Sequence, residues 1–552
     1  MWECLINDLD IHNRLGMKIK EYYEGKRILI TGTTGFLGKV VLEKLLWEVP
    51  GLEKVILLIR PGKGQALTQE AATSRFKNCI ASSRLFDRLR DREPDFEDYL
   101  KKKIDCFPCD LAEEGLGISD PYRKEICDGL DAIIHVAAEV SWQERVDRSI
   151  KINTLATKQL LDCAKSVTPH PHFIYISSAY VNGFRSGTVR EQLFDPEKSI
   201  ANELGGKVPF SIENEIEFAL ANSKIVDAES HSTDLYESFK EEAEQQRLAG
   251  NKIDVSLKDQ IETIRQNHVR SQLSDAGMKQ ANLHGWTDTY TFSKAMAEML
   301  LVKHQENVPI AIIRPPGITS AVKEPAKGWL EGFHLVEPLI VGMGKGLIKA
   351  FPGLESSLID TVPVDYVVNL TLSACATLEE GTEPSVFQIG TSQTNPIDLA
   401  SISTIWRSYF NKNPLTNDAG KLVSVPPIKF FNCPKAFNQK IQRRYLYPLN
   451  LAQVLLKGTK FAGKSKSYQK AVYWVAKSKK RVQRICQFSD LYSAYTMNSW
   501  VFSSENTMGL FRRLSNKDQQ AFDFDTTKID WKSYWQETHI PGMKKYVLKD
   551  NP

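Results

Sequence analysis

The 552-residue sequence has few of the features that mark secreted, metal-binding or membrane-spanning proteins. Its nine cysteines are odd in number and scattered, which excludes an ordinary secreted disulfide framework. Cys106 and Cys109 form a C-x-x-C pair, but no second pair follows at zinc-finger spacing, so we expect core thiols and no metal site. Glu3, Asp8 and Asp10 stand where a signal peptide is basic and then apolar, and no apolar run reaches bilayer length. We therefore expect an intracellular protein that does not cross a membrane.

Acidic residues are missing from one long segment. Residues 419–489 contain no Asp or Glu but 16 Lys or Arg, interleaved with ten aromatic residues, although the net charge of the whole chain is only +4. Such a segment indicates an anionic partner for this part of the chain. An anionic membrane surface, single-stranded nucleic acid and a plain basic surface without a partner all fit this composition.

The beginning of the chain carries a nucleotide-binding pattern. In KRILITGTTGFLGKVVLEKLL, an apolar strand-like run at 28–31 is followed by Gly32, Gly35 and Gly38 and then by helical periodicity. Glycines at this spacing let the backbone turn tightly, approach a pyrophosphate and pack a helix against a strand. A tight turn without a ligand is the alternative, but the strand and helix on both sides favour dinucleotide binding.

The second strand-like run, KVILLIRPGKG, favours NADPH as the cofactor. It ends in Arg60, where an NAD-preferring site usually has Asp or Glu. A guanidinium can form a bidentate contact with a 2′-phosphate, and Lys63 is close in sequence. A surface arginine at the end of a strand is the alternative interpretation.

Nearly continuous apolar runs recur at the spacing of β-α-β units. They end near Leu111, Val140, Gly183 and Ile318, and helical stretches such as SIKINTLATKQLLDCAK separate them. Strands buried on both faces of a parallel sheet have this pattern. The sequence therefore predicts an α/β fold with a doubly wound, parallel, Rossmann-type sheet.

Three polar residues suggest reductase chemistry. Tyr290 and Lys294 are separated by four positions, so on a helix they face the same ligand. A nearby ammonium should lower the pKa of the phenol and make Tyr290 a better proton donor to a developing alkoxide. Ser178 follows a predicted central strand, where open α/β sheets bind ligands, and it could orient a carbonyl. Ser177 is the competing choice for that role.

This constellation resembles the extended short-chain dehydrogenase/reductase family, in which Ser, Tyr and Lys are catalytic. The resemblance implies that Lys294 also holds the nicotinamide ribose and that Asn153 supports Lys294 through water. It places the cofactor-binding residues in the glycine loop, at strand ends and on two helices: Thr31, Gly32, Thr34, Gly35, Phe36, Leu37, Gly38, Arg60, Asp110, Leu111, Ala137, Asn153, Tyr290, Lys294 and Pro316.

Longer stretches resemble one branch, the alcohol-forming fatty acyl-CoA reductases. They are EYYEGKRILITGTTGFLGKVVLEKLL, LFDRLRDREPDFEDYL, WTDTYTFSKAMAE, KGWLEGF, DTVPVDYVVN and FDFDTTKIDWKSYWQETHIPGMKKYVLK, and they span essentially the whole chain. The resemblance implies two NADPH-dependent reductions of a long-chain acyl-CoA, first to an aldehyde and then to an alcohol that feeds wax ester or ether lipid synthesis. One departure is IIRPPGITSA, where Pro316 and Gly317 replace the usual residues after Arg-Pro.

The same resemblance sets the expected domains and partners. We expect an N-terminal extension at 1–24, a reductase domain at 25–375 and a smaller, mostly helical C-terminal domain at 395–552. A long-chain acyl substrate favours membrane contact through 419–489, with no nucleic acid, and the phosphates of coenzyme A are a second anionic target. The protein would then be cytosolic or peripherally associated with a membrane, which in a eukaryote is the endoplasmic reticulum or peroxisome surface, and the sequence gives no oligomeric state.

The reductase domain should contain a helical insertion. Tyr290 follows Ser178 by 112 positions, and the polar stretch at about 185–285 is rich in Glu, Gln and Lys with sparse apolar residues. We expect helices that either wall the acyl site or only decorate the surface. The rival functions are a reductase that stops at the aldehyde, an extended short-chain enzyme for a sterol or sugar nucleotide, and a membrane adaptor with idle catalytic residues.

Overall fold

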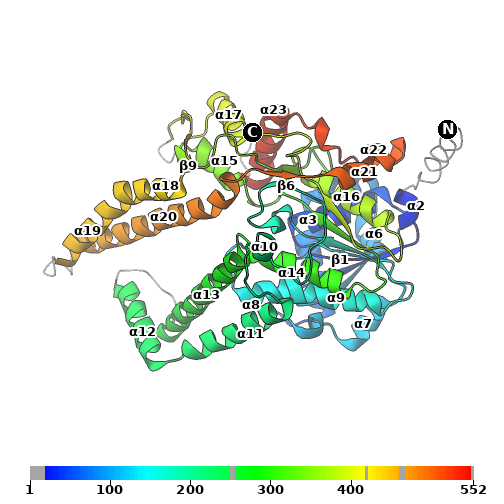
Figure 1. Ribbon diagram of the computed structural model, residues 1–552, viewed down its shortest axis with the longest axis horizontal. Helices are drawn as coiled ribbons and strands as arrows, with labels where there is room; N and C mark the ends of the chain where they lie inside the picture. The colour runs from blue at the N-terminus through cyan, green and yellow to red at the C-terminus, as the bar shows by residue number, and fades with distance from the viewer. Residues whose placement is uncertain (1–18, 249–254, 417–419, 459–465, 549–552) are drawn as a thin grey trace.

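The computed structural model describes residues 19–248, 255–416, 420–458 and 466–548 and contains a seven-stranded parallel sheet (Figure 1). The strand order is β3-β2-β1-β4-β5-β7-β11, which is the dinucleotide-binding order with one further edge strand. The bounds are β1 Arg27–Thr31, β2 Lys54–Ile59, β3 Ile104–Pro108, β4 Ala132–His135, β5 His172–Ile176, β7 Ile310–Arg314 and β11 Ser385–Gln388. The predicted α/β fold is confirmed, and the strand order reverses between β1 and β4.

The strands are apolar because helices cover both faces of the sheet. On β1, Ile28 and Ile30 pack into one hydrophobic layer, whereas Leu29 packs into the layer on the other side. Cys106 lies on β3 and Cys109 just after it, and both are buried as expected of core thiols. Helices α3 (Phe36–Glu48) and α16 (Val364–Ala376) pack together, whereas α9 (Ala156–Lys165) packs against α14 (Thr289–His304).

The Rossmann unit extends beyond the expected domain limits. Strand β11 starts after residue 375, and α2 (Ile19–Tyr23), from the expected N-terminal extension, packs against α16. The Tyr23 hydroxyl donates a hydrogen bond to the Leu372 carbonyl at 2.8 Å. From the C-terminal region, β13 (Trp500–Phe502) pairs in parallel with β6 (Gly187–Val189). The segment expected to form a C-terminal domain therefore shares a strand pair with the reductase unit.

Residues 185–285 form mainly a helical arm. Helices α11 (Ile212–Glu229), α12 (Thr233–Leu248) and α13 (Leu257–Leu283) project from the body at the lower left of Figure 1. A small apolar cluster that includes Phe239 and Ile261 joins α12 to α13, and α13 packs at its other end against α8 (Val146–Ser149) and α14. The predicted helical insertion is thus present.

The acid-free segment forms a second arm. Helices α18 (Pro434–Ile441) and α19 (Tyr447–Gly458) pack against the long helix α20 (Lys466–Thr496), and α20 runs back into the body (Figure 1). No helix in the described ranges is both long and apolar enough to span a bilayer. The C-terminal end of α20 reaches the large cleft at the carboxyl edge of the sheet.

Candidate active site

A cleft of about 920 Å³ opens at the carboxyl ends of the central strands. This is where an open α/β sheet binds ligands, beside the reversal of strand order. Most of the residues that the sequence predicts for the site line this cleft. They are Gly32, Thr34, Gly35, Phe36, Leu37, Gly38, Arg60, Asp110, Leu111, Ala137, Ser178, Tyr290, Lys294 and Pro316. The fold therefore brings together strand ends and helices that are far apart in the sequence.

The glycine loop has the close packing that a dinucleotide site needs. Gly32 has φ +77°, and a Cβ there would lie 2.6 Å from the Ala137 amide nitrogen. A Cβ on Gly38 would lie 2.4 Å from the Gly32 carbonyl oxygen. Helix α3 begins after Gly35 with no side-chain cap, so its first amides face the cleft as an anion site. These residues fit the pyrophosphate of a nicotinamide cofactor.

Thr31 and Asn153 are near the site but are not among the described residues that line the cleft. The Thr31 hydroxyl oxygen accepts hydrogen bonds from the amides of Val136 and Ala137 at 3.2 and 3.1 Å. The Asn153 side chain accepts from the Glu139 amide at 2.8 Å and donates to the Ser293 hydroxyl at 2.9 Å. Both side chains therefore fix the loop after β4 through its backbone amides, without lining the cleft themselves.

Two guanidinium groups lie at the end of β2. Arg60 is exposed and lines the cleft, and Arg75 from α4 (Gln69–Phe76) lines it as well. Arg75 donates hydrogen bonds to the carbonyls of Arg60 and Pro61, which fixes the turn after the strand. Sequence reasoning missed Arg75 because nothing in its local pattern shows that α4 returns to β2.

Tyr290 and Ser178 meet in the cleft. Tyr290 lies in the first turn of α14, and Ser178 follows β5 and caps the short 3₁₀ turn η5 (Ala179–Asn182). Burial raises the pKa of the Tyr290 phenol above its ordinary value, the Asp288 carboxylate raises it further, and a hydrogen bond with Ser178 lowers it. Tyr290 therefore holds its proton at neutral pH, and the expected lowering of its pKa by Lys294 is wrong for this state of the site.

The neighbouring serine is engaged elsewhere. The Ser177 hydroxyl donates a hydrogen bond to Glu298, whose carboxylate forms a buried ion pair with Arg314 at 2.5 Å. Among the described residues no hydrogen bond joins Ser178 to that pair, and its hydroxyl accepts one from the Tyr180 amide at 3.2 Å. The geometry therefore favours Ser178 as the residue that polarises a carbonyl.

Lys294 is held in an unusual environment. Its side chain is 1% exposed, and its ammonium donates to the Ile176 carbonyl at 2.5 Å and lies 3.9 Å from the centre of the Tyr175 ring. Burial lowers the pKa of Lys294 to about 7, and the Glu298 carboxylate opposes this shift. A lysine with this pKa can hold or release a proton near neutral pH.

Aromatic residues from distant segments form one wall of the cleft. Trp142 stacks on Tyr495 at 5.3 Å and meets Tyr492 edge-on at 5.6 Å, and Tyr495 meets Tyr180 edge-on at 4.8 Å. The Tyr495 hydroxyl donates to the carboxylate of Asp288, the residue that caps helix α14, at 2.8 Å. No single stretch of sequence contains this aromatic wall, so pattern analysis missed it.

The helical arm does not contribute to this cleft. In the part of the chain that the structure describes, no residue that lines the cleft comes from 185–285. The alternative in which the insertion walls the acyl site is therefore not supported, and the C-terminal end of α20, with Phe488, Leu491, Tyr492 and Tyr495, lines the cleft instead.

The parallel Rossmann-type sheet and the glycine loop, in a chain that matches a family of reductases, define an oxidoreductase with a nicotinamide cofactor. More narrowly, the chain belongs to the fatty acyl-CoA reductases. Residues 30–371 and 455–550 match two family models that are both described as male sterility protein.

Relatives from plants and animals match nearly the whole chain. It is 32% identical to the probable fatty acyl-CoA reductase 5 of Arabidopsis thaliana, over 96% of this chain and 99% of that protein. It is 29% identical to the alcohol-forming fatty acyl-CoA reductase of Simmondsia chinensis, again over 96% and 99%. Fatty acyl-CoA reductase 1 of Gallus gallus is 28% identical over 97% of this chain and 87% of that protein.

Among solved structures, the terminal R domain of the myxalamid PKS-NRPS pathway shares the fold. Its TM-score is 0.52 at 14% identity, with 99% of both chains covered. The reductase domain of a Mycobacterium tuberculosis non-ribosomal peptide synthetase has a TM-score of 0.50 at 15% identity, with 98% of this chain and 96% of that chain covered.

Proposed function

We propose that the protein reduces long-chain fatty acyl-CoA to a primary fatty alcohol with NADPH, through a bound or transient aldehyde. The observation that carries this proposal is the cleft in which Ser178, Tyr290 and Lys294 face the glycine loop, in a chain similar throughout to an alcohol-forming enzyme. An enzyme that stops at the aldehyde is the second candidate. The alcohol would feed wax ester or ether lipid synthesis.

The residues of the cleft suit two successive carbonyl reductions. NADPH bound along the glycine loop supplies one hydride for each reduction. Ser178 hydrogen-bonds the carbonyl oxygen, and Tyr290 donates its proton as the oxygen gains charge. The resulting hemithioacetal loses coenzyme A as the thiol, and the aldehyde left behind presents the same kind of carbonyl to the same residues. Lys294 can return a proton to Tyr290 between the two steps because its pKa is near 7.

The preference for NADPH rests on the two arginines at the end of β2. Arg60 and Arg75 both line the cleft, and a 2′-phosphate there would meet two guanidinium groups. Among the described residues, neither side chain forms an ion pair with a carboxylate. Arg60, and the N–H groups of Arg75 that do not bind the Arg60 and Pro61 carbonyls, are therefore available to an anionic group of the cofactor.

The function is tested with purified protein, NADPH and a saturated long-chain acyl-CoA. Coenzyme A release, NADPH consumption and the lipid product are measured together. Two NADPH per alcohol support the proposal, one NADPH per accumulated aldehyde supports the second candidate, and absence of turnover contradicts both. NADH at the same concentration should support much slower turnover.

We also propose that the arm formed by α18, α19 and α20 rests on an anionic membrane surface. On α19, Leu451, Val454 and Leu455 lie on one face and are 62, 65 and 62% exposed. Trp474 on α20 is 63% exposed and is followed by Lys477, Lys480, Arg481 and Arg484. Exposed apolar side chains with surrounding cations are the pattern of an interfacial helix.

Vesicle binding tests this contact. Leu451→Glu together with charge reversal at Lys480 and Arg481 should weaken sedimentation with vesicles that contain phosphatidylserine. Ile225→Glu is the matched control, because Ile225 is also exposed, at 54%, but lies on α11 of the other arm. Equal binding by both variants would contradict the membrane contact.

A further inference from the structure

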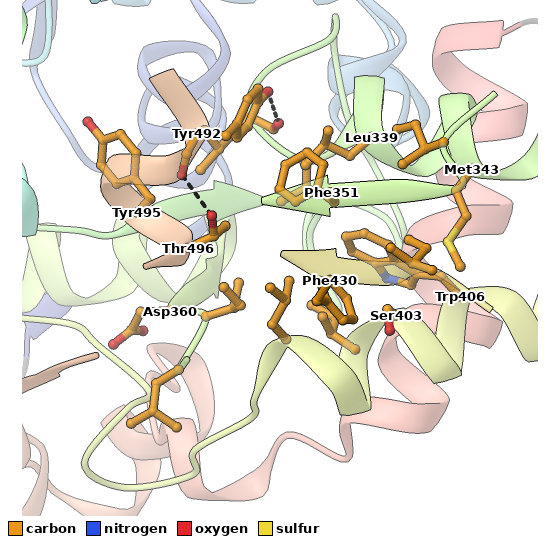
Figure 2. Close-up of a pocket in the computed structure, with 18 of the residues that line it drawn as sticks. Leu339, Met343, Phe351, Asp360, Ser403, Trp406, Phe430, Tyr492, Tyr495 and Thr496 are labelled. Carbon is orange, nitrogen blue, oxygen red and sulfur yellow. Dashed lines mark hydrogen bonds between the residues drawn. The ribbon is translucent and has the colours of Figure 1, made fainter. Parts of the chain in front are cut away.

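A second, apolar cavity lies beside the cleft, behind the aromatic wall. It has a volume of about 70 Å³ and lies among α15 (Glu337–Gly344), β9 (Ala350–Pro352), α17 (Leu399–Lys412), β12 (Lys429–Phe431), the end of α20 and β13 (Figure 2). The cavity is lined mainly by large apolar side chains, among them Leu339, Met343, Phe351, Ile402, Trp406 and Phe430. Its volume is far smaller than the 920 Å³ of the cleft.

The polar groups that line this cavity are engaged with protein atoms. The Asp360 carboxylate accepts hydrogen bonds from the amides of Thr391 and Ser392 at 2.6 and 3.0 Å. The Thr496 hydroxyl donates to the Pro352 carbonyl at 2.8 Å, and the Ser403 hydroxyl to the Ala400 carbonyl at 2.8 Å.

The tyrosine hydroxyls at this cavity are bound in the same way. The Tyr492 hydroxyl donates to the Leu335 carbonyl at 2.7 Å, and that of Tyr180 to the Asp360 carbonyl at 3.3 Å. Of the lining groups that the structure describes, only the indole N–H of Trp406 has no partner. Apart from that N–H, the cavity therefore offers an apolar contact surface to a ligand.

Four residues belong to both the cavity and the cleft. Tyr180, Leu335, Tyr492 and Tyr495 line each of them, so these residues lie at the boundary between the two spaces. Tyr180 is also two positions from Ser178, the residue that faces the carbonyl. The boundary between the two spaces therefore includes a residue that neighbours Ser178 in the chain.

We propose that this cavity, the acyl pocket, takes the distal methylene groups of the acyl chain and sets the longest chain that the enzyme accepts. The inference rests on the proposed function, because it concerns the substrate of the same site. The aromatic wall forms the entrance, where small movements of Tyr492 and Tyr495 admit the chain. Met343 and Trp406 lie on the side of the pocket away from these tyrosines in Figure 2 and form its closed end.

The closed end is rigidly built. Trp406 packs edge-on against Trp535 at 5.3 Å, and Trp535 is fully buried. A chain that outgrows the pocket therefore meets side chains that cannot move aside easily. Each methylene that the pocket buries should raise kcat/KM roughly fourfold. A methylene that does not fit into the pocket should bring no such increase.

A matched pair of variants on α17 tests the pocket. Ser403→Leu fills its closed end, whereas Ser401→Leu makes the same chemical change on the exposed side of the same helix. We measure kcat/KM for saturated acyl-CoA thioesters that lengthen in steps of two methylenes. Ser403→Leu should lower the ratio of long-chain to medium-chain kcat/KM by roughly tenfold, and Ser401→Leu should leave it unchanged. Equal losses at all lengths for Ser403→Leu would overturn the proposal.

The opposite change should have the opposite effect. Met343→Ala enlarges the closed end and should move the preferred acyl chain to a longer length. This gain of activity with longer substrates cannot come from general damage to the fold. No change in preference, with the enzyme still active, would contradict the assignment of Met343 to the end of the pocket.

A photoaffinity experiment keeps this inference separable from the proposed function. The probe is a long-chain acyl-CoA with a diazirine at the end of its chain, and the labelled peptides are identified by mass spectrometry. Labelling within 335–360, 399–406 or 492–502 supports the acyl pocket even if the wild type shows no turnover. Labelling of α11–α13 or of α19 instead would overturn it, whatever the activity.

Discussion

The buried ammonium of Lys294 predicts a pH-dependent stability cost that can be removed by substitution. Its pKa is lowered to about 7 in the folded protein, against an ordinary lysine value of 10.5. Between these two values the unfolded chain binds a proton that the folded chain does not. Relative to a variant without the ammonium, the free energy of unfolding of the wild type therefore rises with pH across this window. This gain is lost as the pH falls to 7.

The magnitude follows from the size of the shift. Each pH unit within the window changes the free energy of unfolding by about 1.4 kcal/mol. Between pH 7 and pH 9, the difference between Lys294→Met and the wild type should therefore shrink by about 2 kcal/mol, because the folded site is already half deprotonated at pH 7. The loss of the hydrogen bond to the Ile176 carbonyl lowers the stability of Lys294→Met by about 1–2 kcal/mol at every pH, so it does not alter the slope.

Guanidinium unfolding at pH 6, 7, 8 and 9 measures this difference. Lys294→Met should be the more stable protein at pH 6 and lose its advantage towards pH 9, while turnover is abolished throughout. Lys158→Met, which removes an exposed ammonium, controls for the loss of a lysine as such. A difference that is constant from pH 6 to pH 9 would refute the interpretation of Lys294 as a buried base with a lowered pKa.

Four further substitutions test the other parts of the site. Tyr290→Phe should lower kcat by about 10²- to 10⁴-fold with little change in NADPH binding, and an active variant would exclude Tyr290 as the proton donor. Ser178→Ala should lower kcat by about 10²-fold, whereas Ser177→Ala should mainly lower the melting temperature because it loses a hydrogen bond to a buried carboxylate. The reverse ranking of the two serine variants would exchange their roles. Arg60→Ala should raise KM for NADPH by about tenfold or more and leave KM for NADH nearly unchanged, and parallel changes would contradict a contact with the 2′-phosphate.

Local sequence patterns predicted the parts of this protein that local physics determines. The glycine loop was recognisable because Gly32 and Gly38 occupy positions where a Cβ would collide with backbone atoms. The strands were recognisable because both of their faces are buried, and Ser178 because it follows one of them. The helical spacing of Tyr290 and Lys294 placed both on one face of α14, as the structure has them.

Long-range packing determined what the sequence could not predict. Tyr495 meets Asp288 only because α20 returns to the body, and no local pattern contains this contact. One expectation was that the insertion at 185–285 would wall the acyl site. Instead, the return of α20 brings its C-terminal end to the aromatic wall and the acyl pocket. The expected effect of Lys294 on Tyr290 failed for a related reason. Burial, which depends on the whole fold, outweighs the spacing of two charges along a helix.

One site should deliver two hydrides to the same carbon of the acyl group. The most direct test uses NADPH deuterated at both C4 hydrogens, a long-chain acyl-CoA and mass spectrometry of the product. A primary alcohol with two deuterium atoms at C1 is the predicted result. An aldehyde with one deuterium as the only product, or an alcohol with fewer than two, would contradict the account.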